Sequence, residues 1–199
     1  MSEPICKVAD IIYVRFELTE FEAQKKYFNH FGLMLAHEDD NSIFFRGSAT
    51  TPYVYVASKG KENKYIGTAY KANEYSDLEA LAKEFNVDIV ENKDPGGGHK
   101  VTVTDPDGIE VEICHGMSSV EPMAVVSKVL NTGQSKQREN ELQRFGKASA
   151  EWEVQGDKWV YKLKSNVKRL GHTAINVRYA KASVCLLYTS PSPRDRVQS

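Results

Sequence analysis

The sequence repeats one pattern: a run of β-branched and aromatic residues followed by a short amphipathic stretch. The first copy spans residues 11–29 and the second spans residues 65–86. Ser76 follows Thr19 at the same distance at which Phe85 follows Phe28, so the two copies align without a gap. A third copy begins at residue 170. Repetition at a fixed distance indicates that one supersecondary unit is used more than once.

Each complete copy predicts the order β-α-β-β-β. The first strands, 11–18 and 65–72, are rich in residues that favour extended backbone. Thr19 and Ser76 stand where helix N-caps are expected, and Gly32 is expected to end the first helix. The remaining strands are expected at 33–38, 42–46, 53–58, 87–92, 99–104 and 109–114. We therefore expect an α+β domain made of two paired βαβββ modules over residues 7–116.

Composition and charge exclude several classes of function. The hydrophobic fraction of 41% and the net charge of −1 are ordinary for a soluble globular protein and give no reason to expect nucleic acid as a partner. No stretch approaches the ~20 apolar residues that cross a membrane, so no membrane partner is expected. The N-terminus lacks the pattern of a secretory signal. We expect a cytoplasmic protein in which Cys6 and Cys114 are reduced thiols.

The C-terminal part divides into three segments. Residues 117–168 are more polar and less patterned, and we interpret them as a connector with a hairpin around 155–157. Residues 169–184 are expected to be the first strand of a second domain. Residues 185–195 resemble the translation of a transposon-end adapter used to prepare sequencing libraries, so we interpret 185–199 as foreign sequence and the chain as a fragment. The alternative is a Ser/Pro-rich disordered C-terminus.

A sequence motif connects this architecture to a known superfamily. Asp105-Pro106-Asp107-Gly108, followed four residues later by Glu112, closes the last strand of the second module. Paired βαβββ modules with this motif resemble the vicinal oxygen chelate superfamily, which includes glyoxalases, bleomycin- and fosfomycin-resistance proteins and extradiol ring-cleaving dioxygenases. The resemblance covers residues 7–116 and again 169–184. It implies a metal ligand on the first strand of a module and a glutamate on the last strand of its partner.

The ligand positions implied by the resemblance are poorly filled in the first two copies. Tyr13 stands at this position in the first copy, and Tyr70 or Thr68 in the second, so neither copy supplies a histidine. Glu112 occupies the glutamate position without imidazole partners, and we expect it to be solvated or hydrogen-bonded rather than bound to metal. His115 should lie on the opposite face of its strand from Glu112.

The third copy differs because it carries His172. In two-domain extradiol dioxygenases the N-terminal domain has lost the metal and the C-terminal domain carries iron. The resemblance therefore implies that His172 is the first ligand of an Fe(II) site with two histidines and one carboxylate. From the residues alone, a histidine paired with a neighbouring strand is the alternative. The other ligands and the acid/base group would lie beyond Val184.

The leading functional hypothesis is a fragment of a non-haem Fe(II) extradiol dioxygenase. The parent protein would cleave a small aromatic diol of the catechol type with O₂, and the resemblance also allows a homo-oligomer. The fragment itself is expected to bind no metal, to be inactive, and to leave residues 169–184 exposed. One alternative is a metal-free binding or resistance module. Its cleft would be lined by Tyr13, Phe16, Tyr53 and Tyr55. A further alternative is a glyoxalase-like metal-dependent lyase or isomerase.

Overall fold

The computed structural model of the chain describes residues 5–123, 152–155, 158–161, 167–174 and 178. Most of the expected connector, part of the third copy and the whole of 185–199 lie outside the described residues. No helix in the described part is long and apolar enough to cross a membrane.

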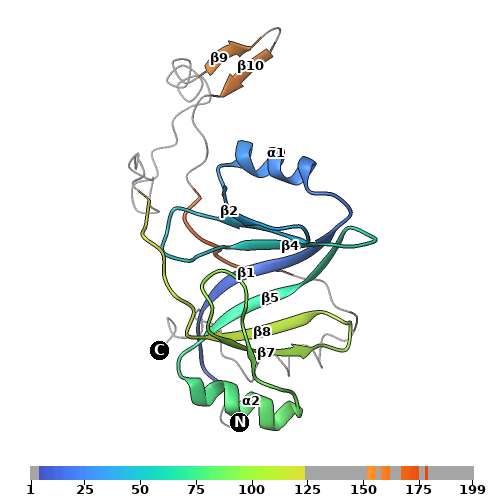
Figure 1. Ribbon diagram of the computed structural model, residues 1–199, viewed down its shortest axis with the longest axis vertical. Helices are drawn as coiled ribbons and strands as arrows, with labels where there is room; N and C mark the ends of the chain where they lie inside the picture. The colour runs from blue at the N-terminus through green and yellow to red at the C-terminus, as the bar shows by residue number, and fades with distance from the viewer. Residues whose placement is uncertain (1–4, 124–151, 156–157, 162–166, 175–177, 179–199) are drawn as a thin grey trace.

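The first repeat folds into one βαβββ module and the second repeat into another (Figure 1). The first module comprises β1 (Val8–Leu18), α1 (Glu22–Phe31), β2 (Met34–Glu38), β3 (Ser42–Arg46) and β4 (Tyr55–Lys59). The second comprises β5 (Lys64–Ala72), α2 (Tyr75–Phe85), β6 (Val90–Glu91), β7 (His99–Thr104) and β8 (Glu110–His115). The expected hairpin is also present, as β9 (Trp152–Gln155) and β10 (Lys158–Tyr161).

The two modules share one eight-stranded sheet in the order β2-β3-β4-β1-β5-β8-β7-β6. Within each module the first strand pairs in parallel with the last, β1 with β4 and β5 with β8. The modules meet where β1 and β5 pair antiparallel. Because each half of the sheet repeats the other in reverse order, the first strands of both modules lie side by side at the centre. This arrangement confirms the α+β fold of paired βαβββ modules.

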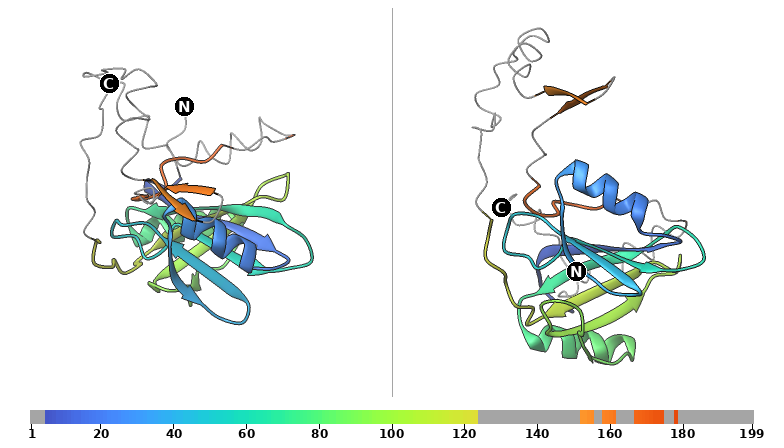
Figure 2. Two further views of the ribbon diagram at one scale, coloured as in Figure 1. Left: turned by 90° about the horizontal axis from the view of Figure 1, so that it is seen from above. Right: turned by 45° about the horizontal axis from the view of Figure 1, so that its top comes forward.

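Both helices cover the same face of this curved sheet, one for each module. On β3, Ile43 and Phe45 contribute to the cluster that contains Phe28 of α1, whereas Phe44 between them belongs to a cluster on the other face. Alternation of side chains along a strand requires this division. Figure 1 and the right view of Figure 2 show α1 and α2 at opposite ends of the eight-stranded sheet.

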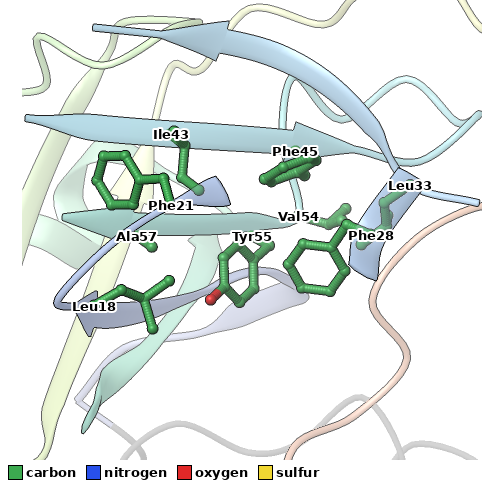
Figure 3. Packing of buried hydrophobic residues seen from close by; sticks show 9 residues of the cluster. All are labelled: Leu18, Phe21, Phe28, Leu33, Ile43, Phe45, Val54, Tyr55 and Ala57. Atoms are coloured by element: carbon green, nitrogen blue, oxygen red, sulfur yellow. The ribbon is translucent and has the colours of Figure 1, made fainter. Parts of the chain in front are cut away.

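Three apolar clusters make up the core. The α1 cluster joins α1 to β3 and β4, and Figure 3 shows its residues, among them Phe28, Phe45 and Tyr55. The α2 cluster joins α2 to β7 and β8. The third cluster lies on the face away from the helices and joins the two modules. It contains Ile12, Tyr13, Phe44, Tyr53, Val56, Ala69 and Cys114.

The helix ends differ in part from expectation. Gly32 ends α1 with a left-handed φ of 99°, as predicted, and its N–H donates to the Phe28 carbonyl. The predicted N-caps are wrong, because Phe21 and Glu74 occupy those positions. The Asp77 carboxylate accepts the backbone N–H groups of Glu74 and Lys7, and this pair of bonds starts α2 before Ser76.

One strand is shorter than predicted. The expected strand 87–92 is reduced to Val90–Glu91. Val87 is not available for the sheet, because its N–H donates to the Ala82 carbonyl at the end of α2. Val87, the first residue of the predicted strand, therefore belongs to the hydrogen-bonded end of the helix.

Candidate functional site

The centre of the sheet brings together Tyr13 and Glu112, two positions at which the sequence resemblance implies metal ligands. Tyr13 on β1 lies opposite Ala69 on β5, and Ala69 lies opposite Glu112 on β8. Directly opposed residues share a face of the sheet. All three side chains are buried, with exposed fractions of 0%, 0% and 1% respectively. They form a row across three neighbouring strands on the face away from the helices.

The register corrects the ligand position of the second module. The sequence indicated Tyr70 or Thr68, but Ala69 occupies the row. The pairing of β1 with β5 shifts between Ile11 and Tyr13, and a shift of one residue exchanges the two faces of a strand. Tyr70 accordingly packs against the α2 cluster. Ala69 offers no atom that could bind a metal.

Glu112 is held by three side chains. The Tyr13 hydroxyl donates to Oε2 of Glu112 at 2.8 Å. The Arg15 guanidinium donates to Oε1 at 2.9 Å, and the Lys100 ammonium lies 2.9 Å from the same oxygen. A buried carboxylate is tolerated only when it is paired and hydrogen-bonded, and here both conditions are met. We call Tyr13, Arg15, Lys100 and Glu112 the charge cluster.

The two cations connect the buried carboxylate to the surface. The Arg15 and Lys100 side chains are 28% and 16% exposed, and each also faces a second carboxylate, Glu110 at 2.8 Å and Asp94 at 3.8 Å. Burial lowers the pKa of Arg15, but the nearby Glu112 and Glu110 carboxylates outweigh this effect and raise it overall. Arg15 therefore remains charged throughout the range of protein stability.

Aromatic and thiol groups surround the cluster on its inner side. The Tyr13 and Tyr53 rings lie 4.6 Å apart, and Tyr53 is fully buried. Burial is the largest cause that raises the pKa of Tyr13 and of Tyr53, so both stay protonated. Burial also raises the pKa of the Cys114 thiol to about 12, which makes it unreactive. Cys6 and Cys114 are both buried, and neither forms a disulfide in the described part of the chain.

The four aromatic residues expected to line a cleft do not share one surface. Tyr13 and Tyr53 lie in the cluster on the face away from the helices. Phe16 and Tyr55 stack on each other, with ring centroids 5.1 Å apart, within the α1 cluster. They therefore cannot line a common cleft, and the central positions are filled by packed side chains.

The residues at the ligand positions do not fit a metal. Both carboxylate oxygens of Glu112 accept hydrogen bonds, and the Tyr13 hydroxyl donates its proton to one of them. The two cations beside Glu112 would repel a divalent ion. Among the described residues, no group of three or more His, Cys, Asp or Glu side chains is placed to hold one.

The histidines are placed separately from this cluster. His115 packs against Tyr75 of α2, with ring centroids 5.9 Å apart, and so lies on the opposite face from Glu112, as predicted. His172 is exposed, and within the described part of the chain it belongs to no group of three or more potential metal ligands. Its role as a metal ligand stays a prediction.

Sequence reasoning missed Arg15 and Lys100. A signal was present, because Val101 and Val103 alternate toward α2 and this places Lys100 on the face of Glu112. Lys100 lies directly opposite Cys114 on β8 and is the diagonal neighbour of Glu112, two residues before Cys114. A lysine at an inward-facing strand position, opposite a strand that carries an inward-facing glutamate, predicts a buried ion pair.

Comparison with solved structures identifies the fold. The Mn(II)-bound glyoxalase from Novosphingobium aromaticivorans is similar with a TM-score of 0.56 and 23% identity, covering 60% of this chain and 43% of that chain. Homoprotocatechuate 2,3-dioxygenase from Arthrobacter globiformis is similar with a TM-score of 0.53 and 23% identity over 61% and 40% of the two chains.

Homoprotocatechuate 2,3-dioxygenase from Brevibacterium fuscum was solved as a complex with 3,4-dihydroxyphenylacetate. It gives a TM-score of 0.52 and 21% identity over 61% of this chain and 41% of that chain. No model of a protein family matches the sequence, and no curated protein matches it. The described domain therefore has the vicinal oxygen chelate fold. The chain spans less than half the length of these structural neighbours.

Proposed function

We propose that this chain is part of a two-domain non-haem Fe(II) extradiol dioxygenase that cleaves a catechol-type ring with O₂. Residues 7–116 would be its metal-free N-terminal domain, and residues 169–184 would begin the catalytic domain. The observation that carries the proposal is a contrast between repeats. The ligand row of the first domain is closed by Tyr13, Ala69 and the paired Glu112, whereas the third copy presents His172.

Each part of the chain has a defined role in this proposal. His172 would donate one imidazole nitrogen to iron, together with a second histidine and a glutamate from residues beyond Val184. When bound, the iron would serve as Lewis acid and as a template for two neighbouring substrate oxygens and O₂. The charge cluster would contribute no ligand and would hold the centre of the first domain together. The parent dioxygenase would act in the cytoplasm on a small aromatic diol.

Both a glyoxalase and extradiol dioxygenases are similar to this chain in fold, and this similarity supports one alternative with a different reaction class. The Mn(II)-bound glyoxalase is as similar in fold as the dioxygenases, so a glyoxalase-like lyase or isomerase is the second candidate. A metal-free binding module is less well supported, because the side chains expected to line its cleft are packed in two separate clusters.

The proposal is tested on the protein encoded by the source DNA when it is read beyond codon 184. We expect a fourth copy that begins with histidine and ends in Asp-Pro-Asp-Gly-x-x-x-Glu. The Fe(II)-loaded protein should consume one O₂ per catechol cleaved, and His172→Ala should abolish this uptake. Lys168→Ala is the control for His172→Ala, because Lys168 is an exposed residue close to His172 in the sequence.

Three outcomes would overturn the proposal. A stop codon soon after codon 184 would favour the binding module. Conversion of a hemithioacetal without O₂ uptake would favour the glyoxalase-like reaction. Catechol cleavage by the 199-residue chain alone, at the rate of the longer protein, would contradict the assignment of the catalytic site to the second domain.

A further inference from the structure

The start of the third copy lies against the first domain instead of standing free. The Ser48 N–H donates to the Val167 carbonyl at 2.9 Å, and the Ala49 N–H donates to the Lys168 carbonyl at 3.1 Å. These bonds join it to the loop that follows β3. Val167 and Lys168 belong to the expected connector. The described residues within 169–184 form no strand, and most of them are exposed, as expected, whereas Leu170 and Thr173 are partly buried.

Apolar side chains on one side of the segment complete the α1 cluster. Val167 and Leu170 pack against this cluster, as do the partly buried Val14 and Phe16 of the first domain. Figure 3 shows the ribbon of the segment passing the cluster on the side of Phe28 and Leu33. Leu170 of the third copy and Val167 just before it therefore contact the first domain.

Polar contacts extend the attachment across both modules. Arg169 forms an ion pair with Asp10 on β1. Further along, Thr173 accepts a hydrogen bond from the Thr68 hydroxyl on β5 at 3.4 Å. The Arg178 N–H donates to Asp107, in the turn between β7 and β8, at 2.8 Å. The contacts thus run from the loop after β3 to the far module and cross the seam between β1 and β5.

Gly47 makes the close approach of the two backbones possible. A Cβ atom at Gly47 would lie 2.2 Å from the Lys168 carbonyl oxygen and 2.8 Å from that of Val167. The clash would be with backbone atoms, so a small side-chain movement could not relieve it. Gly171 within the segment is different, because a Cβ atom there would meet nothing within 4 Å.

We propose that residues 167–174 form an anchor segment. The loop after β3, the α1 cluster and the β1–β5 seam are a docking surface for this segment of the same chain. The first domain is complete only when the anchor segment is bound, and its boundary lies after residue 174 rather than near 116. Docking also fixes the place at which the following domain begins, with Leu170 facing the first domain and His172 facing solvent.

Site-specific trypsin cleavage of the full 199-residue chain tests the anchor. Lys168 and Arg169 are cleavage sites inside it, and mass spectrometry reports cleavage at each bond separately. The native chain should be protected at these two bonds, because cleavage requires the segment to detach first. Gly47→Ala should raise the cleavage rate there by at least about tenfold if detachment becomes easier by about 1.4 kcal/mol.

Matched variants separate docking from folding of the first domain. Gly171→Ala is the control for Gly47→Ala and should leave protection unchanged. Leu170→Asp alters only the anchor segment and should also expose Lys168 and Arg169, whereas His172→Ala should not. Cleavage of the native chain as fast as in an unstructured peptide of the same sequence would overturn the proposal. Unchanged protection in both Gly47→Ala and Leu170→Asp would also overturn it.

The outcome is independent of the proposed catalytic function. Trypsin protection needs neither iron nor a catechol, so an active enzyme without protection would disprove the anchor alone. Protection without dioxygenase activity would leave the anchor intact and remove the function.

Discussion

Tyr13 and His172 align in two copies of the same sequence repeat, but their surroundings are opposite. Tyr13 is fully buried and donates its proton to Glu112, which two cations also hold. His172 is exposed on a segment whose other side is docked. Tyr13 lies within β1, whereas residues 167–174 form no strand, so the two copies share a sequence pattern and not a backbone arrangement. The predictions below test this contrast, beginning with the largest expected effect.

Removal of the Glu112 carboxylate should have the largest effect on stability. Glu112→Ala leaves two cations without their shared partner, and breaking a buried pair costs about 3–5 kcal/mol. We expect the lower end because Arg15 and Lys100 reach solvent. Glu110→Ala is the control. Glu110 is 34% exposed and pairs with Arg15, so its loss should cost below about 1 kcal/mol. Urea unfolding measures both, and equal costs would remove the special role of Glu112.

Lys100→Met should destabilise the domain by about 2 kcal/mol, the contribution of a hydrogen bond to a charged group. The side chain keeps its length, and the Glu112 carboxylate keeps Arg15 and Tyr13. Combining Lys100→Met with Glu112→Leu should recover part of the loss, because an apolar pair can replace a buried ion pair. A double-mutant cycle in urea gives the coupling between the two side chains. Strict additivity would contradict the charge cluster.

Two tyrosines provide a matched pair for the hydrogen bond to Glu112. Tyr13→Phe should cost about 1.5 kcal/mol or more, because it removes a bond to a buried carboxylate. Tyr53→Phe should cost less, because the Tyr53 hydroxyl lies beside the neutral Tyr13 and Asn92 side chains and not against a carboxylate. Both rings are fully buried, so packing changes little in either variant. Thermal unfolding compares them, and a larger cost for Tyr53→Phe would contradict the account.

The last effect appears only at alkaline pH and is absent at neutral pH. The pKa of Cys114 rises from 9.0 to about 12 in the folded state. The unfolded chain therefore loses this proton first, and stability should be retained below pH 9 and fall as the pH rises toward 12. Cys114→Ala should flatten this part of the stability curve relative to Cys6→Ala, which is the control. An unchanged slope in Cys114→Ala would assign the loss to other groups.

Features that depend on local or repeating patterns could be predicted from the sequence. The repeat and its strand runs predicted the paired modules, and Gly32 predicted the end of α1. The N-cap predicted at Ser76 was wrong, because the Asp77 carboxylate accepts the N–H groups of Glu74 and of Lys7, which lies far away in the sequence. Short-range preference yields to such tertiary bonds.

The site was only partly predictable, because its register depends on strand irregularities. The shift between Ile11 and Tyr13 moves Ala69 into the ligand row, and spacing in the sequence does not reveal such a shift. The position of Glu112 was predicted correctly, but the cations that hold it come from two other strands. The anchor was missed because the third copy was expected to find partners only within its own domain.

The central claim is that metal chemistry belongs to the third copy and not to the first domain. Iron content per folded chain, measured on the protein encoded beyond codon 184, tests it most directly. The account predicts one iron per chain in the native protein, the same value in Glu112→Gln and almost none in His172→Ala. Loss of iron in Glu112→Gln together with its retention in His172→Ala would contradict it.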